Sequence, residues 1–229
     1  MNVDIAELAG RYPHIYHMAH ADAWEGIATH GLLSTSSLLD LFEIRGEARA
    51  GIESARRADS IVITHPRHGR AVIRDNKPIS DAKLARSLVG IDPPDFYRLL
   101  NQRVFFWLTE QRLETLLGAR AYRNDAQLVI TVETERLLDR YSHAVTLSAI
   151  NSGSTAYRAM PRGEATFVPV EEYDYEGRRR VRGAAGAIAE LAVKGGVPDL
   201  LELALTAERR CPDGTRQPLW SRRAAGATR

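Results

Sequence analysis

The chain has 229 residues, of which 44% are hydrophobic and 26% charged, and its formal net charge at pH 7 is +2. This balance excludes an intrinsically disordered chain and allows one domain with a substantial core. Because Cys211 is the single cysteine, an internal disulfide and a cysteine metal site are both excluded. No segment has the roughly 20 apolar residues of a membrane span, and the first residues lack the features of a signal peptide, so we expect a cytoplasmic protein.

The first half of the chain shows mainly helical patterns. Asp22 and Glu25 form a capping-box pattern ahead of apolar residues at helical spacing, which predicts a helix over 22–30. The hydroxyl residues at 34–37 offer N-caps for a second short helix. Further along, the pattern predicts a hairpin of strands 60–64 and 71–74, and helices over 80–90 and 92–100.

The second half shows mainly strand patterns. VFFWLT, residues 104–109, is an apolar run of strand length, and the segment after it has the pattern of a helix. We expect strands over 126–132, 143–150 and 165–170, followed by a strand at 190–197 and a strand or helix at 200–208. Together these helices and strands predict an α+β fold, with helices mostly in the first half of the chain. This order excludes a doubly wound nucleotide fold, and no glycine-rich phosphate loop is present.

Arginines gather late in the chain. Residues 176–183 read EGRRRVRG, and the segment from Glu208 to Arg229 holds six arginines. We expect a single domain over 1–208 and a basic, flexible tail over 209–229. Such arginines suit nucleic-acid phosphates, although a solvated surface rich in arginine has the same composition.

Two kinds of catalytic site find little support in the sequence. His14, His17 and His20, and the pair His65 and His68, are spaced by three residues but lack the additional ligands of a metal site, so no metal is expected. The serine-containing loop NSGST lacks the G-x-S-x-G pattern of a nucleophile elbow.

The segment YHMAHADAWEGIATHGLLSTS resembles the first motif of the ADP-ribosyltransferase superfamily, including RNA 2'-phosphotransferases, poly(ADP-ribose) polymerases and the DarT family. The shared features are a histidine on the first strand, a helix with an isoleucine, a glycine–leucine exit and hydroxyl residues after it. His17 occupies the place of the motif histidine, and Met18-Ala19 replaces a glycine and hydroxyl pair. The same segment resembles an uncharacterised bacterial family. The resemblance covers about residues 12–170 and implies split β-sheets that form an NAD cleft.

The resemblance also implies a set of NAD-binding and catalytic residues. His17 would anchor a ribose hydroxyl, with Met18 beside it, and Ser34 and Thr35 would bind the pyrophosphate. Alternation along the aromatic strand places Phe105 and Trp107 on one face and Phe106 on the other. Phe106 or Trp107 would hold the nicotinamide ring, with Arg112 just beyond. Glu164, before a late strand, best matches the catalytic glutamate, and Glu133 and Glu135 are its competitors.

The function that this resemblance implies is transfer of ADP-ribose from NAD to a nucleic-acid acceptor, a DNA or RNA base, without a metal. Tyr157 and Arg158, with Arg178, Arg179 and Arg180, would contact the nucleic acid. Two alternatives stay open: an inactive NAD- or nucleic-acid-binding module of the same fold, and an RNA 2'-phosphotransferase-like enzyme. Each site residue also has a structural reading, in which His17 and the aromatic residues pack in the core, Glu164 is an exposed turn residue and the serines cap a helix.

Overall fold

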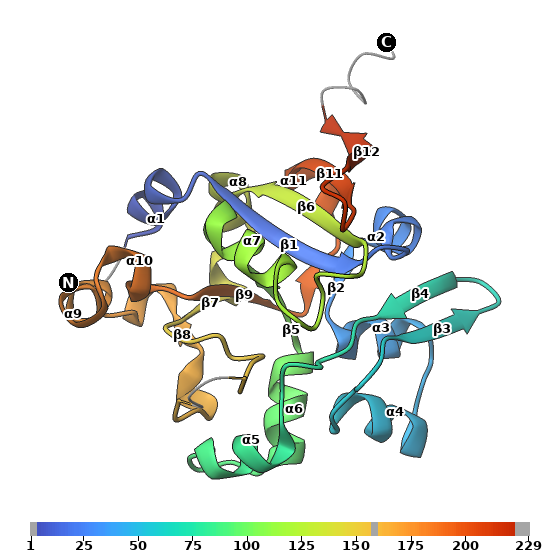
Figure 1. Ribbon diagram of the computed structural model, residues 1–229, viewed down its shortest axis with the longest axis horizontal. Helices are drawn as coiled ribbons and strands as arrows, with labels where there is room; N and C mark the ends of the chain where they lie inside the picture. Colours follow the sequence, from blue (N-terminus) through green and yellow to red (C-terminus); the bar gives the residue numbers. More distant parts are fainter. Residues whose placement is uncertain (1–3, 157–159, 223–229) are drawn as a thin grey trace.

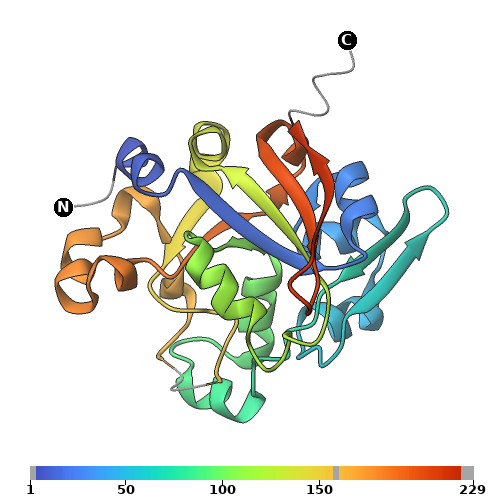
Figure 2. The same ribbon diagram turned by 45° about the horizontal axis from the view of Figure 1, so that its top comes forward.

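The computed structural model describes residues 4–156 and 160–222, and its two largest sheets have four antiparallel strands each. The first sheet has the order β1 (His14–His20), β6 (Gln127–Glu133), β11 (Ala204–Arg210) and β12 (Arg216–Ser221). The second has the order β5 (Arg103–Phe106), β9 (Glu190–Lys194), β7 (Val145–Ser148) and β8 (Val168–Pro169). Figure 1 shows both sheets, and Figure 2 shows the strands of the first sheet side by side.

The two sheets meet where β1 passes the end of β5. Tyr16 and Trp107 exchange both backbone hydrogen bonds, with N···O distances of 2.9 Å and 2.8 Å. This isolated bridge joins two separate sheets through one pair of residues. The expected α+β class with split sheets is therefore confirmed.

Helices surround the sheets, and α1 to α7 begin in the first half of the chain. Ser34, among the N-caps that the sequence offers, accepts a hydrogen bond from the backbone N–H three residues ahead, and Asp92 and Thr109 cap later helices in the same way. The helices are α1 (Ile5–Arg11), α2 (Trp24–His30), α3 (Thr35–Leu41), α4 (Gly46–Glu53), α5 (Asp81–Ser87), α6 (Pro93–Asn101), α7 (Glu110–Leu117), α8 (Thr134–Tyr141), α9 (Tyr175–Arg182), α10 (Ala184–Ala187) and α11 (Leu200–Leu203), with short 3-10 turns η1 (Ser142–Ala144), η2 (Glu164–Thr166) and η3 (Val170–Glu172).

Two short ladders complete the fold. The predicted hairpin is present as β3 (Ile61–His65) and β4 (Gly69–Ile73). Residues 32–33 form β2, which pairs with 196–197, the strand β10. Beside this ladder Gly31 has φ of 80°, and a Cβ there would lie 2.2 Å from the carbonyl oxygen of Pro198. A glycine at this position therefore allows the close approach of the two segments.

The largest core cluster lies around the two sheets. It includes Ile15, Ile130, Val132, Leu191 and Val193, each at most 1% exposed. These residues sit on strands of both sheets, so burial of one apolar surface stabilises the two sheets together.

The end of the chain differs from the expected tail. Residues 204–210 and 216–221 pair as β11 and β12, while residues 223–229 lie outside the described part. Arg210 forms ion pairs with Glu208 and Glu114, and Trp220 lies 6.2 Å from the ring of Trp24. Arg210 and Trp220 thus contact residues elsewhere in the fold. The sequence of this segment, taken alone, indicates a solvated tail.

A buried arginine fixes the segments on either side of the hairpin. The Arg57 side chain is 8% exposed and donates to Arg74 O at 3.1 Å, Ile52 O at 2.6 Å and Asn101 Oδ1 at 2.9 Å. Desolvation lowers the pKa of its guanidinium to about 10. The guanidinium therefore stays charged at neutral pH, and its three hydrogen bonds to neutral oxygens offset part of the cost of burying the charge.

We expect Arg57→Met to destabilise the fold by roughly 3 kcal/mol, because it leaves three buried oxygens without a donor. For a chain of this length the melting temperature should fall by about 6–12 °C. Calorimetry measures the change, with Arg45→Met, at an exposed residue, as the control. If the melting temperatures of the two variants differ by less than about 2 °C, the three hydrogen bonds contribute little to stability.

Candidate functional site

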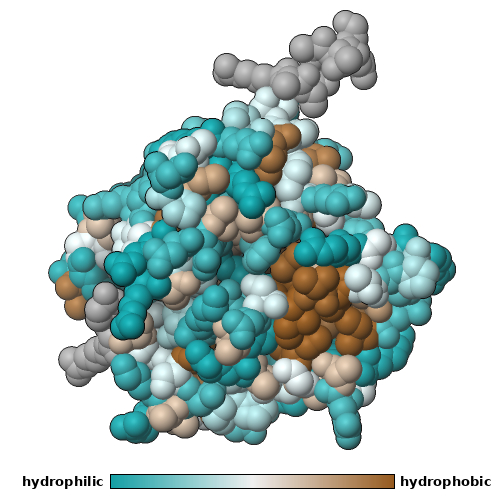
Figure 3. All heavy atoms as spheres, turned by 45° about the vertical axis from the view of Figure 1, so that its right-hand side comes forward, coloured by the Kyte–Doolittle hydropathy of each residue, from teal (hydrophilic) through white to brown (hydrophobic). Residues whose placement is uncertain are grey.

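A cavity of about 1180 Å³ lies where the two sheets meet. Its walls come from β1, β2, β4, the end of β5, α7, the loop after β7 and the start of β9. The wall near the hairpin is apolar and includes Leu33, Leu38, Val72 and Ile73. Figure 3 shows hydrophobic residues in one continuous area on the side of the molecule that carries the hairpin. The cavity is somewhat larger than the usual range for ligand pockets and has their mixed apolar and polar lining.

His17 lies on β1 and lines the cavity. Its Nδ1 lies 2.9 Å from the carbonyl oxygen of Phe105. A carbonyl accepts only, so Nδ1 carries the proton, and Nε2 of the neutral ring is an acceptor. Burial lowers the pKa of His17 to about 4, and the nearby charge of Arg74 also lowers it. The ring is therefore neutral at pH 7 and presents one acceptor nitrogen.

The aromatic strand contributes one of its two faces to the cavity. Phe105 and Trp107 line it, whereas Phe106 is fully buried in the core, with its ring 5.7 Å from that of His17. This is the alternation that the sequence predicts. Trp107 is therefore placed to contact a planar ligand, and Phe106 supports the histidine from the core side.

Glu190 is the glutamate of the cavity. It is the first residue of β9, and the ladder pairs Phe106 with Leu191. Because opposed residues in an antiparallel pair share a face, the next step of this register puts Glu190 on the same face as Trp107. Glu190 is 3% exposed and lines the cavity.

The Glu190 carboxylate is held by one residue of the loop after β7. The N–H and hydroxyl of Ser152 donate to Oε2 at 3.0 Å and 2.7 Å. Burial raises the pKa of Glu190 to about 7, although these hydrogen bonds and the charges of Arg162 and Arg112 oppose the rise. No described residue donates to Oε1. Glu190 thus has one anchored and one unoccupied oxygen and titrates near neutral pH.

The structure does not bring the three expected glutamates to the cavity. Glu164 is exposed in η2, and Glu135 is exposed on α8. Glu133 forms ion pairs with Arg222 at 2.6 Å and Arg136 at 3.0 Å. Among the described glutamates, the one that lines the cavity is Glu190, which lies 26 residues after Glu164 in the sequence.

Four other expected residues do line the cavity: Met18, Ser34, Thr35 and Arg112. Ser34 is 1% exposed, and its hydroxyl accepts from Ser37 N at 3.1 Å and lies 3.0 Å from the Ser37 hydroxyl. This hydroxyl is thus used for capping α3, which matches the structural reading.

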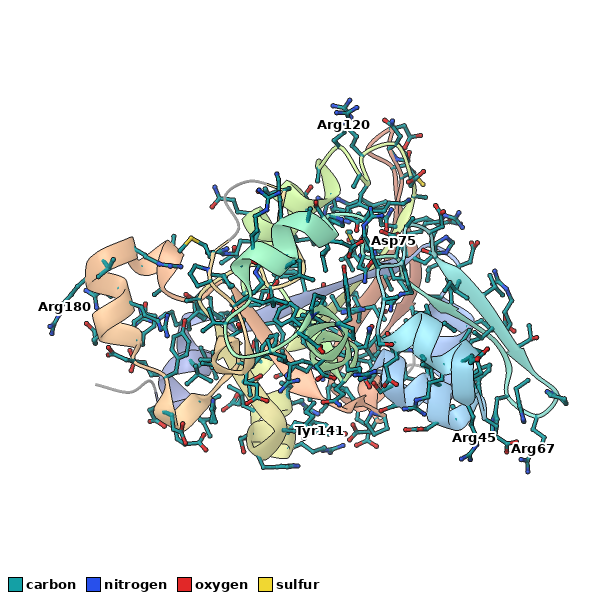
Figure 4. All side chains as sticks on the ribbon, turned by 90° about the horizontal axis from the view of Figure 1, so that it is seen from below. Arg45, Arg67, Asp75, Arg120, Tyr141 and Arg180 are labelled. Atoms are coloured by element: carbon teal, nitrogen blue, oxygen red, sulfur yellow. The ribbon has the colours of Figure 1, made fainter. Side chains whose placement is uncertain are left out.

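The expected nucleic-acid contacts are not brought together around the cavity. Tyr157 and Arg158 lie outside the described residues. Arg178, Arg179 and Arg180 lie on α9 and are not part of the cavity lining. Arg178 lies over the ring of Tyr173, Arg179 pairs with Glu176, and Arg180 projects from the molecule (Figure 4).

Sequence reasoning missed Arg74, which follows β4 and lines the cavity. Its guanidinium lies 4.2 Å from the centre of the Tyr122 ring, and NH1 donates to Met18 O at 2.7 Å. Its Nη2 atom is buried and has no hydrogen-bond partner of normal geometry among the described residues. Burial lowers the pKa of Arg74, which stays a cation at neutral pH. An unsatisfied cationic donor beside His17 is suited to an anionic ligand group.

Two structural absences apply to the described residues. Within 4–156 and 160–222, no group of three or more histidine, cysteine, aspartate or glutamate side chains is arranged to hold a metal ion. Among the same residues, none of the helices has the length and apolar character needed to span a bilayer.

These features define an α+β protein with a cavity between two antiparallel sheets. The chain belongs to the family described as "Family of unknown function (DUF7002)", whose model matches residues 13–204. A comparison with curated proteins gives no significant match. Among solved structures, the chain is similar to "Thermosipho africanus DarTG in complex with ADP-ribose", with 12% identity and a TM-score of 0.41. The match covers 86% of this chain and 43% of the other, so the chain spans less than half of that structure.

Proposed function

We propose that the protein binds NAD in this cavity and transfers ADP-ribose to a nucleic-acid base. The observation that carries the proposal is that the neutral His17 of one sheet and the Glu190 carboxylate of the other line one cavity of dinucleotide size. The sequence resemblance of the His17 segment to ADP-ribosyltransferases supports the same ligand.

NAD would lie with its nicotinamide ring against Trp107 and Phe105, whose aromatic faces suit a flat ring. The Nε2 atom of His17 would accept a hydrogen bond from a ribose hydroxyl. Arg74 would bind the pyrophosphate, because its buried NH2 group lacks a partner and a charge-assisted hydrogen bond would satisfy it. This assigns to Arg74 the role that the sequence suggests for Ser34 and Thr35.

Glu190 would act at the bond that breaks. The glycosidic electron pair leaves with the nicotinamide nitrogen, and positive charge develops at the ribose carbon, where a carboxylate stabilises it. The acceptor nitrogen or oxygen then bonds to that carbon, and its proton passes to Glu190. Because Ser152 holds Oε2, we assign the reacting oxygen to Oε1.

The assay is release of nicotinamide from NAD in the presence of single-stranded DNA or RNA, with mass analysis of the nucleic acid. Release together with an added ADP-ribose mass is the expected result. Absence of both, with NAD binding retained, would instead favour the second candidate, a module that binds without turnover. One observation favours this candidate. The backbone carbonyl of Met18, next to His17, already accepts a hydrogen bond from Arg74, so it is less available to a ligand in the cavity.

We expect the rate of nicotinamide release to rise with pH and to level off above a midpoint near 7. The pKa of Glu190 is about 7, and only its ionised form stabilises the positive ribose carbon. His17, with a pKa of about 4, stays neutral over the range from pH 5.5 to 9 and adds no second step there. Initial rates across that range measure the profile. A rate that does not change with pH would contradict the assignment of the titrating group to Glu190.

A further inference from the structure

One residue of the loop after β7 is held on two sides. In this loop, residues 149–156, Ser152 is fully buried. Its N–H and hydroxyl donate to Oε2 of Glu190 at 3.0 Å and 2.7 Å, and its own carbonyl accepts from Nη1 of Arg162 at 2.9 Å. Because Ser152 contacts both groups, Arg162 can act on the Glu190 carboxylate through it.

Arg162 holds more than one point of this loop. It is 3% exposed, its Nη1 also donates to Ser154 O at 3.0 Å, and its Nε donates to Met160 O at 3.1 Å. The acceptors of these hydrogen bonds are neutral carbonyl oxygens, which offset only part of the cost of burying a cation. An apolar side chain of similar size would fill the same space without that cost. The buried guanidinium therefore indicates a role beyond packing.

The backbone of Arg162 and the loop itself are both attached to α5. At the end of α5, Arg162 N donates to Ser87 O and Arg162 O accepts from Val89 N, each at 2.9 Å. Ahead of α5, Thr155 Oγ1 accepts from the N–H of Ser80 at 2.7 Å. Ser80, Ser87 and Val89 do not line the cavity. The loop thus has supports outside the cavity, as a group that orients a reacting carboxylate needs.

Opposing effects decide whether the Glu190 carboxyl is ionised. Burial favours the neutral acid, whereas the hydrogen bonds of Ser152 and the positive charges of Arg162 and Arg112 favour the carboxylate. The loop therefore supplies most of the groups that keep this buried carboxylate ionised. The charged or titratable side chains that line the cavity with it include Arg162 of the loop, Arg112 on α7, Arg182 on α9, which donates to Ala149 O of the loop, and the neutral His17 on β1.

We propose that Arg162 is a positioning residue, which through Ser152 keeps the Glu190 carboxyl in the ionised form that transfer of ADP-ribose requires. The proposal rests on the proposed function and adds to it the control of its carboxylate. With the loop in place, Oε2 has two donors and Oε1 stays available for the reaction. With the loop displaced, the buried carboxylate loses both donors and takes up a proton from solvent, so the site loses its negative charge.

The test follows the ionisation of Glu190 directly, by NMR titration of the protein without NAD, labelled with carbon-13 at the glutamate carboxyls. Glu190→Gln, which lacks one signal, identifies the resonance. Ser152→Ala removes the donor hydroxyl and keeps the backbone N–H, and Arg162→Gln removes the charge. The matched control is Ser154→Ala, in the same loop, whose hydroxyl accepts from Ala156 N at 3.3 Å and does not contact Glu190.

The titration midpoint of Glu190 should rise by about 1 pH unit in Ser152→Ala and at least as much in Arg162→Gln, because each variant loses a group that favours the carboxylate. The control should keep the wild-type midpoint. The midpoint of nicotinamide release should move in the same direction. A merely structural role of Arg162 would lower the melting temperature and leave the Glu190 midpoint unchanged, which would overturn the proposal.

The double variant tests whether Arg162 acts through Ser152. The two rises should then be less than additive, and fully additive rises would overturn the positioning role. Should Arg162→Gln not fold, Arg162→Lys replaces it, because it keeps the charge but not the spacing of the donors. A raised midpoint in that variant supports positioning, and an unchanged one overturns it. If the wild type releases no nicotinamide, the proposed function fails, whereas the NMR midpoints still decide how Glu190 is controlled.

Discussion

Glu190→Gln is expected to reduce nicotinamide release by at least ~100-fold, because a neutral amide neither stabilises the positive ribose carbon nor accepts the acceptor proton. The amide keeps the size of the side chain. It can still accept the hydrogen bonds of Ser152, so the fold and the NAD affinity should change little. Single-turnover rates and calorimetric titration with NAD separate these two effects.

Glu164→Gln is the matched comparison for this experiment. Glu164 is the glutamate that the sequence favours, yet its side chain is exposed on η2 and does not line the cavity. Its substitution should leave the rate within about twofold of wild type, since surface changes of this kind have small effects. The opposite outcome, a loss at Glu164 with full activity at Glu190, would refute the assignment of the carboxylate.

His17→Phe is expected to weaken NAD binding by roughly tenfold or more. The change removes the Nε2 acceptor of the ribose hydroxyl, which is worth about 1 kcal/mol or more of binding energy. It also leaves the Phe105 carbonyl without its donor, which lowers the stability of the free and the bound protein alike. An aromatic ring at this position keeps the packing against Phe106. Titration with NAD and with free ADP-ribose measures both affinities.

The control is His14→Phe, a histidine on the same strand that is exposed and does not line the cavity. We expect it to bind both ligands as the wild type does. If His17→Phe binds NAD with unchanged affinity while the control behaves as expected, the ribose is not held by His17.

The parts of the fold that local chemistry determines follow from the sequence. Hydroxyl and carboxylate N-caps indicate the starts of α3, α6 and α7, and alternation in VFFWLT indicates which aromatic side chains share a face. The wall formed by His17 and Trp107 is predictable for the same reason. His17 lies on β1 and Trp107 directly follows β5, and the alternation of side chains along both segments can be read from the sequence.

The rest of the site depends on contacts between distant segments. Glu190 and Glu164 both fit the pattern of a glutamate at the start of a late strand, because ELAVK also has the sequence of a strand. Only the structure distinguishes them, since it buries Glu190 against the loop that contains Ser152. Arg74 and Arg182 stand in ordinary basic segments, and only the fold brings them to one cavity. Likewise β12 looks like a polar tail until its pairing with β11 is known.

The most direct test of the account is a crystal structure of the protein with an NAD analogue in which the ring oxygen of the nicotinamide-bearing ribose is replaced by carbon, so that it binds without turnover. The account predicts density in the cavity with a ribose hydroxyl within hydrogen-bond distance of His17 Nε2, the nicotinamide ring on Trp107 and the ribose carbon beside Glu190. Density for the analogue at another surface, or an empty cavity at a saturating concentration, would contradict it.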